Sequence, residues 1–155
     1  MTELFFATLK ACLGDLTKDL RFLHKPSGTL IAPQIIDVMM DRPTAPVEEG
    51  DEYPLVRWMI YEGEFRRMSA APFKVLVDAG IYTDGSVVEG NAEISRLCSA
   101  LGGIVENPRF APYKLGPVVR FTLGAPESPD KNPGVQPHPY YHCRLFLEFL
   151  VAGGH

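Results

Sequence analysis

The sequence has few of the features that mark a secreted or membrane-bound protein. Of its 155 residues only three are cysteines, an odd number, and each lies inside an apolar run, as small buried side chains do: Cys12, Cys98 and Cys143. No apolar run reaches the roughly 20 residues that a membrane-spanning helix needs. The N-terminal segment lacks the basic stretch and the long apolar stretch of a signal peptide. We therefore expect reduced thiols, a soluble chain made in the cytoplasm, and no contact with a membrane.

The sequence also lacks an excess of positive charge. It has 15 lysines and arginines against 19 aspartates and glutamates, which gives a formal net charge of −4 at pH 7. A general nucleic-acid binder normally carries a basic stripe that neutralises phosphates. We therefore expect no specific nucleic-acid binding.

Motifs that hold phosphate or activate a nucleophile are missing. Gly80, Gly85 and Gly90 match neither a Walker motif nor a dinucleotide-binding motif. No Gly-x-Ser-x-Gly sequence is present, and the apolar surroundings of the cysteines favour inert thiols. Some carboxylates could serve acid–base chemistry, but no pattern distinguishes them from other surface acids: Asp78, Asp84 and Glu89. We predict no catalytic residue and no bound cofactor.

Two groups of side chains could bind a metal, but neither has the spacing of a metal site. Prolines flank His138, and His142 and Cys143 would point to opposite faces of a strand. The acidic residues between positions 48 and 52 lack the fixed spacing of a calcium loop and are typical of a solvated loop. We predict no metal ligand.

The residues that are present predict a single α+β domain. The hydrophobic fraction of 46% and the charged fraction of 22% are ordinary for a globular protein long enough to bury a core. Two β-rich runs, Pro54–Tyr61 and Phe73–Tyr82, predict paired strands around which the rest of the chain packs. We expect a mixed or antiparallel sheet with a long β-hairpin, covered by an N-terminal helix and one central helix.

Apolar periodicity predicts these two helices. Between residues 2 and 23 apolar side chains recur every three or four positions, although Gly14 weakens the middle of this helix and could divide it. The second helix is expected from Asn91, as its N-cap, to Leu101, with a glycine pair at its end. Each helix would present one apolar face to the sheet.

Further β-rich runs predict strands at Val118–Leu123 and at Tyr140–Val151, where alternate residues form one apolar face. Thr29–Met40 fits either a strand or a short helix, and its β-branched residues favour the strand. The stretches 41–51, 107–117 and 125–137 are expected to be loops. A loop as long as the last one is either functional or disordered.

The charged connector Glu62–Ser69 between the paired strands is the best candidate for a contact surface. Its alternating charged and apolar residues allow the two strands to continue as a hairpin arm. Its candidate subunit-contact residues are of types enriched in interface cores: Phe65, Arg66, Arg67 and Met68. The alternative is an ordinary hairpin tip with solvated arginines. We favour the interface.

The order of these parts resembles a known family. An N-terminal amphipathic helix leads to Leu-Ile-Ala-Pro-Gln-Ile and a proline-rich acidic loop. Then follow Glu-Tyr-Pro-Leu-Val-Arg-Trp, the strand Phe-Lys-Val-Leu-Val-Asp-Ala-Gly-Ile-Tyr-Thr, one helix, a Leu-Gly-Pro strand and a closing Gln-Pro-His-Pro-Tyr-Tyr-His-Cys strand. Over most of the chain, this layout resembles the tail-terminator and tail-completion proteins of long-tailed bacteriophages and their prophages, which include the lambda tail terminator.

The resemblance implies an α+β subunit that assembles into a homo-hexameric ring in the tail or neck of the virion. Such rings cap the finished tail tube, halt its polymerisation and present a surface for joining the head. The implied partners are further copies of the chain, the tail tube protein and a head-completion or connector protein. The family has no catalytic residues and no cofactor requirement, so none is carried over.

A closed ring needs two different patches on each subunit. We expect the Phe65–Met68 arm to supply one patch and the loop at 126–137 to face a tail or head partner. Two other hypotheses stay open. The chain could be another phage head–tail connector or head-completion protein, or a small enzyme or ligand-binding domain with a site between the sheet and the helix Ala92–Leu101.

Overall fold

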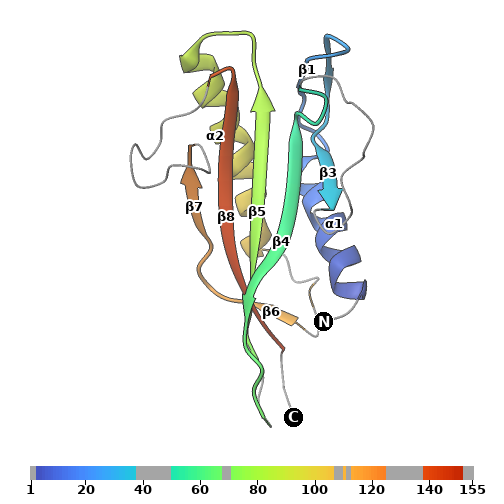
Figure 1. The fold of residues 1–155 in the computed structure, drawn as a ribbon, viewed down its shortest axis with the longest axis vertical. Helices are drawn as coiled ribbons and strands as arrows, with labels where there is room; N and C mark the ends of the chain where they lie inside the picture. The colour runs from blue at the N-terminus through green and yellow to red at the C-terminus, as the bar shows by residue number, and fades with distance from the viewer. Residues whose placement is uncertain are drawn as a thin grey trace.

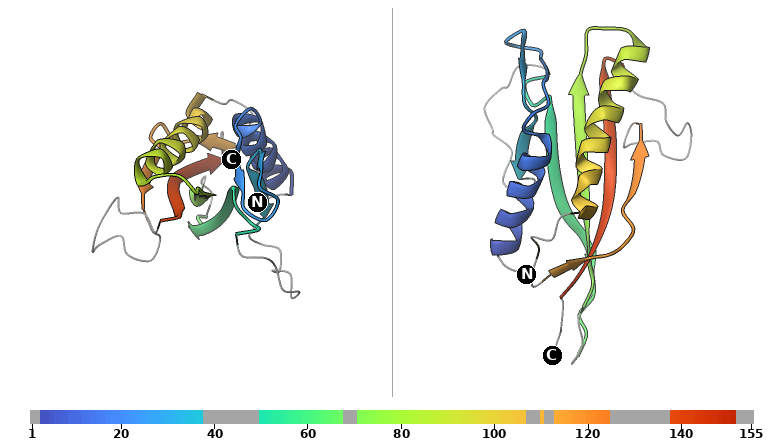
Figure 2. Two further views of the ribbon diagram at one scale, coloured as in Figure 1. Left: turned by 90° about the horizontal axis from the view of Figure 1, so that it is seen from above. Right: turned by 180° about the vertical axis from the view of Figure 1, so that it is seen from behind.

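An elongated β-sheet forms the centre of the structure, and two helices lie side by side on one of its faces (Figures 1 and 2). The structure is a computed structural model, and it describes residues 3–37, 50–67, 71–106, 110, 113–124 and 138–151. The architecture is α+β with a mixed sheet, which confirms the predicted fold class.

The N-terminal helix α1 spans Glu3–Thr17 and ends earlier than its periodicity predicts. It continues unbroken through Gly14, and its sheet-facing side chains are buried: Phe5, Leu9, Cys12 and Leu13. Residues 22–24, which were expected to extend the helix, form a strand instead. The predicted helix over residues 2–23 is therefore wrong in its last third.

The strand β1 (Phe22–His24) pairs antiparallel with β2 (Thr29–Ile31) around a turn in which Gly28 has a φ of +68°. Phe22 is buried, and the guanidinium of Arg96 lies 4.9 Å from the centre of its ring. Pairing with β2 and burial of the Phe22 ring hold residues 22–24 in a strand, so tertiary contacts override the helical period here.

Six strands form the main sheet in the order β3–β4–β5–β8–β6, with β7 also paired to β8 (Figure 1). The predicted hairpin is confirmed, because β4 (Leu55–Gly63) and β5 (Phe73–Tyr82) are antiparallel neighbours. The predicted C-terminal strand β8 (Tyr140–Val151) pairs along the whole of β5. β3 (Gln34–Asp37) runs parallel to β4. The strand preference is confirmed for 29–31 and 34–37, and residues 38–40 lie outside the described part.

Two short strands, β6 (Tyr113–Leu115) and β7 (Arg120–Leu123), pair with successive parts of the same edge of β8. β7 confirms most of the strand expected at 118–123. β6 corrects the prediction of a continuous loop over 107–117. Three residues carry too little periodicity to predict a strand, and β6 is held by contacts such as that between the rings of Tyr113 and Phe5, whose centres are 4.9 Å apart.

The second helix, α2, spans Val87–Gly102 and begins four residues before the predicted start. Its N-cap is Ser86, whose hydroxyl accepts the backbone N–H of Glu89 at 3.2 Å, so the prediction of Asn91 as N-cap is wrong. A serine hydroxyl in an extended residue satisfies an otherwise unpaired N–H of the first turn, and this adds a turn that the apolar pattern did not show. The helix end at the glycine pair is confirmed.

Alternate residues of the central strands face the helices and form the core. Those of β5 and β8 are almost fully buried: Val75, Val77, Ala79 and Ile81 on β5, and Tyr141, Cys143, Leu145, Leu147 and Phe149 on β8. From α2, Ile94, Leu97 and Leu101 fill the space against them with no exposed surface. The residues between these positions point to the other side of the sheet, which carries neither α1 nor α2 and which we call the open face (Figure 2).

Candidate functional site

The predicted arm is a continuation of β4 and β5 past the end of the other strands (Figures 1 and 2). Gly63 lies opposite Phe73, and the backbone N–H of Glu64 donates to the carbonyl oxygen of Pro72 at 3.1 Å. Beyond this point the Phe65 side chain is fully exposed, with a relative exposure of 108%. The structure therefore places an uncovered aromatic ring at the end of the sheet.

Two arginines follow this phenylalanine directly in the sequence of the arm. The Nε and Nη2 atoms of Arg66 lie 2.7 and 2.6 Å from Oε2 of Glu64, and Arg67 is exposed. An exposed ion pair of this kind adds little to stability. Three of the four predicted contact residues thus share the arm, and the fourth, Met68, lies outside the described residues.

A second group of polar side chains, which the sequence did not predict, lies on the open face: Tyr53, Arg57, Asp78, His142 and Arg144. In the strand register, Asp78 of β5 is opposite Arg57 of β4 on one side and Arg144 of β8 on the other. The guanidinium of Arg57 holds Oδ2 of Asp78 through Nε at 2.9 Å and Nη2 at 2.8 Å. Oδ1 faces Nδ1 of His142 at 3.8 Å and Nε of Arg144 at 4.0 Å.

Asp78 is ionised within this polar cluster. The residue is 6% exposed, and burial acts to raise its pKa. The contact with His142 and the charge and hydrogen bond of Arg57 outweigh burial and hold the pKa of Asp78 below its ordinary value. A carboxylate stabilised in this way is a weak base.

Tyr53 extends the polar cluster on the other side of His142. Its hydroxyl oxygen lies 3.0 Å from Nε2 of His142. Burial, followed by the charge of Glu52, raises the pKa of Tyr53 to about 12. The phenol therefore stays protonated, and its O–H can donate to Nε2 of His142.

Gly80 makes room for this arrangement. A Cβ at position 80 would come within 2.7 Å of Cε1 of Tyr53 and 3.0 Å of Cε1 of His142. Any side chain at this position would therefore push the tyrosine away from the sheet. The tyrosine and histidine rings lie at 82° to each other over this gap.

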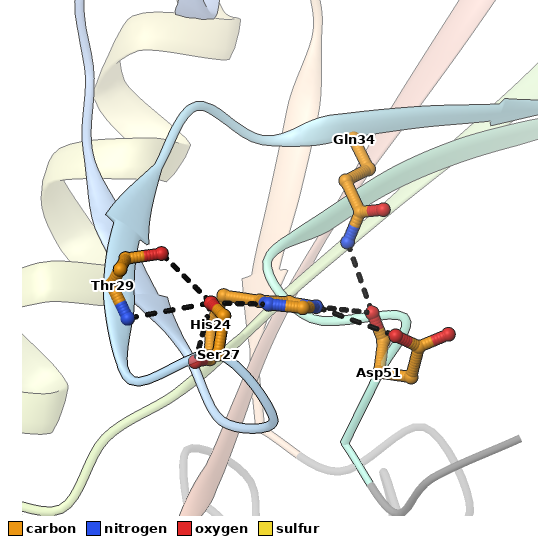
Figure 3. A network of polar contacts seen from close by, with 5 residues as sticks. All are labelled: His24, Ser27, Thr29, Gln34 and Asp51. Carbon is orange, nitrogen blue, oxygen red and sulfur yellow. Dashed lines mark hydrogen bonds and ion pairs between the residues drawn. The ribbon is translucent and has the colours of Figure 1, made fainter.

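A network of contacts fixes the segment that carries Tyr53 (Figure 3). Nε2 of His24 lies 3.2 Å from the backbone oxygen of Asp51, and the amide of Gln34 donates to the same oxygen at 3.1 Å. On its other side, Nδ1 of His24 contacts the hydroxyl of Ser27 at 2.8 Å. The β1–β2 hairpin and the start of β3 thereby hold the chain just before β4, and so hold Tyr53 over the sheet.

A chain of tyrosine, histidine and aspartate can relay a proton, but here the carboxylate is already neutralised by Arg57. Three members of the cluster stand in one row across three neighbouring strands, where opposite charges face each other as cross-strand pairs. The geometry therefore fits a cross-strand ion-pair cluster better than it fits a general base.

The other candidates from the sequence lie apart from this cluster. All three cysteines are buried thiols, as expected, and the Cys98 thiol together with burial raises the pKa of Cys143. Nδ1 of His138 lies 2.6 Å from the hydroxyl of Tyr141. Within the described ranges, no three histidine, cysteine or acidic side chains are grouped to hold a metal ion. Asp84 follows β5, and Glu89 lies in the first turn of α2.

The sequence held one signal for the polar cluster. Arg57, Asp78 and Arg144 are charged residues inside largely apolar strands, and such residues are rarely buried without a partner. The pairing between them depends on strand register, which the sequence did not define. Nothing in the sequence indicated that Tyr53 belongs to this cluster, because its contact partner His142 lies 89 positions away.

Comparisons with known proteins do not assign the chain to a family: no protein-family model matches it, and no curated protein gives a significant sequence match. Among the helices that the structure describes, none is long and apolar enough to cross a membrane.

Proposed function

We propose that this protein is a structural subunit of a bacteriophage or prophage virion. In this proposal it assembles into a homo-hexameric ring, caps the tail tube, ends tail polymerisation and provides the surface for head joining. Its partners are further copies of itself, the tail tube protein and a head-completion or connector protein. The role requires no catalytic residue and no cofactor. The protein would be made in the host cytoplasm and act in the tail or neck of the virion.

The observation that carries the proposal is the exposed arm. Phe65 is uncovered although burying a phenylalanine side chain is worth about 1.5–3 kcal/mol. Arginine beside an aromatic ring is a combination found in interface cores. A neighbouring subunit or a tail protein that covered this ring would gain that free energy, and a ring of six subunits would gain it six times.

The layout of parts that resembles tail terminators also supports the proposal. The loop at 126–137, which we propose faces a tail or head partner, lies outside the described residues. A different head–tail connector or head-completion protein is the second candidate, since the same arm would serve it. An enzyme is the third candidate, and the contact of Tyr53 with His142 is the observation that favours it.

The test of the arm is the assembly of a Phe65→Ala/Arg66→Glu/Arg67→Glu variant, measured by native mass spectrometry and by electron microscopy for rings. We expect rings for the natural sequence, in solution or on the ends of uncapped tail tubes, and a monomeric variant. Unchanged ring formation by the variant would rule out the arm as a subunit contact. Absence of rings in both settings for the natural sequence would contradict the ring itself.

A matched control variant makes equivalent changes at exposed positions away from the arm. Leu30 of β2 is 65% exposed. Lys10 lies on α1 and Lys18 directly follows it, and both are exposed. The variant Leu30→Ala/Lys10→Glu/Lys18→Glu also removes one exposed apolar side chain and reverses two positive charges. Rings that form in this control and not in the arm variant assign the loss to the arm and not to net charge.

A further inference from the structure

The open face carries an exposed apolar row that the ion-pair cluster does not use. We infer that this row is the surface that receives the arm of a neighbouring copy, an inference that rests on the ring proposed above. We call it the open-face patch, and it consists of four residues: Met59, Tyr61, Leu76 and Phe146.

The open-face patch is continuous across three strands. Met59 is opposite Leu76 in the register of β4 and β5, and Leu76 is opposite Phe146 in the register of β5 and β8. The ring of Tyr61 lies with its centre 6.5 Å from that of Phe146. Met59 is 40% exposed and Tyr61 is 43% exposed, while Leu76 and Phe146 are half-buried.

The arm cannot cover the patch of its own subunit. The contacts between Gly63 and Phe73 and between Glu64 and Pro72 keep the arm in line with β4 and β5. Residues 64–67 therefore extend away from the sheet on which the patch lies (Figures 1 and 2). The ring of Phe65 can reach an open-face patch only on another molecule.

The charges of the two surfaces are complementary. Beyond Gly63, the described residues of the arm are 64–67, and they hold one acid and two arginines, a net charge of +1: Glu64, Arg66 and Arg67. The side of the patch nearest the arm holds two acids and one lysine, a net charge of −1: Glu62, Lys74 and Glu148. Nζ of Lys74 is 3.2 Å from Oε2 of Glu62, so Glu148 is the acid best placed to accept a contact from the neighbour's Arg67.

A positive charge flanks the patch at its β7 edge, where Arg120 is opposite Phe146 in the strand register. There the guanidinium of Arg120, on β7, lies 5.0 Å from the centre of the Phe146 ring. With Arg67 near Glu148, Phe65 can lie between Met59 and Tyr61 of β4, where a flexible thioether and an aromatic ring both adapt to an inserted ring.

A second copy is the occupant that these features favour. A closed ring requires a heterologous contact, in which one patch of each subunit meets a different patch of the next. The arm and the open-face patch are two different surfaces of one chain that match in polarity and in charge. Each subunit would offer its arm to one neighbour and its patch to the other.

The test uses two full-length chains, each able to make only half of the contact. The first carries Phe65→Asp, which disables its arm, and is labelled with carbon-13 on its methionine methyl groups. The second is unlabelled and carries Met59→Lys, which places a positive charge in its patch and leaves its arm intact. Because Met59 is 40% exposed, its replacement leaves the core unchanged.

We expect the Met59 methyl signal of the first chain to shift and saturate as the second is added, up to about 1 mM protein. We also expect the mixture to stop at a dimer of the two chains, because only one contact is available. An unlabelled control chain with both substitutions should give no shift. A shift that persists with this control, or no shift with the intact arm, would overturn the inference.

Ring formation is measured separately on the natural sequence and on the Met59→Lys chain alone. Rings of the Met59→Lys chain would show that ring formation does not need the patch, which overturns the inference and leaves the proposed ring intact. An arm-dependent Met59 shift without rings of the natural sequence would support the contact and contradict the proposed function.

Discussion

Replacing Gly90 with alanine should destabilise this protein, although the same change stabilises most helices. Gly90 lies in the first half of α2, at the point where the helix rests on the ring of Tyr141. A Cβ at position 90 would overlap Cζ and Cε2 of Tyr141 and come within 2.8 Å of Cε1. The ring has no room to move, because Tyr141 has no exposed surface and its hydroxyl contacts His138.

Two opposing effects set the size of the change. Alanine is more favourable than glycine inside a helix by about 1 kcal/mol. Forcing an extra methyl group into a packed core costs about 1–3 kcal/mol. The ring contact is too close for a small adjustment, so we expect a net loss of roughly 1–2 kcal/mol for Gly90→Ala.

Gly102 offers a control on the same helix. No atom lies within 4 Å of a Cβ built at this position, so Gly102→Ala should be neutral or stabilise by up to about 1 kcal/mol. Urea unfolding, followed by circular dichroism and by fluorescence of Trp58, the sole tryptophan, measures both variants. Equal stabilisation by the two substitutions would refute the reasoning.

A double variant isolates the contact that we hold responsible. In a Tyr141→Leu background the ring is absent, and Gly90→Ala should then become neutral or stabilising. The interaction energy from the double-mutant cycle should therefore be of the order of 1–3 kcal/mol. A cycle that closes with no interaction would show that the cost lies elsewhere in α2.

Three further changes test the polar cluster and the helix cap. Asp78→Asn leaves two arginines without their carboxylate, and since these are partly exposed we expect a loss of about 2–3 kcal/mol in urea unfolding. The folded pKa of Asp78 lies below its unfolded value of about 3.9. The stability that the carboxylate contributes is therefore complete above about pH 5 and disappears as the pH falls through the folded pKa. The Asp78→Asn variant should lack this part of the acid sensitivity. Tyr53→Phe should cost about 1–2 kcal/mol, because it removes the hydroxyl that contacts Nε2 of His142, and unchanged stability would contradict that contact. Ser86→Ala should cost about 1 kcal/mol of stability whereas Asn91→Ala costs less than about 0.5 kcal/mol, and a reversed order would restore Asn91 as the N-cap.

The strands that the sequence predicted well are those with a long alternating pattern. Tyr140–Val151 showed it over twelve residues, and the structure places its apolar half against the helices. The elements that were missed or misplaced are short or held by distant contacts. β6 has three residues. β1 was taken for helix because the apolar period continues to residue 23, whereas the contact of Phe22 with Arg96 of α2 is not visible in the sequence.

The candidate surfaces show the same difference between local features, which were predicted, and distant contacts, which were not. The arm was predicted from adjacent residues, because alternating charged and apolar side chains between two strands are a local feature. The polar cluster was not predicted, although Asp78 and His142 had each been considered for other roles. Their partners come from three strands and from the segment before β4, and a contact of that kind depends on register.

By itself, the sequence determined an α+β fold, the central hairpin, the apolar face of the last strand and the position of the arm, because all of these follow from periodicity and from neighbouring residues. Only the tertiary structure decided that Asp78 stands between two arginines, that Tyr53 covers Gly80, and that an apolar row on the open face lies beyond the reach of its own arm. These features join residues that are far apart in the chain. Strand pairing brings them together, and no local pattern in the sequence records which strands will pair.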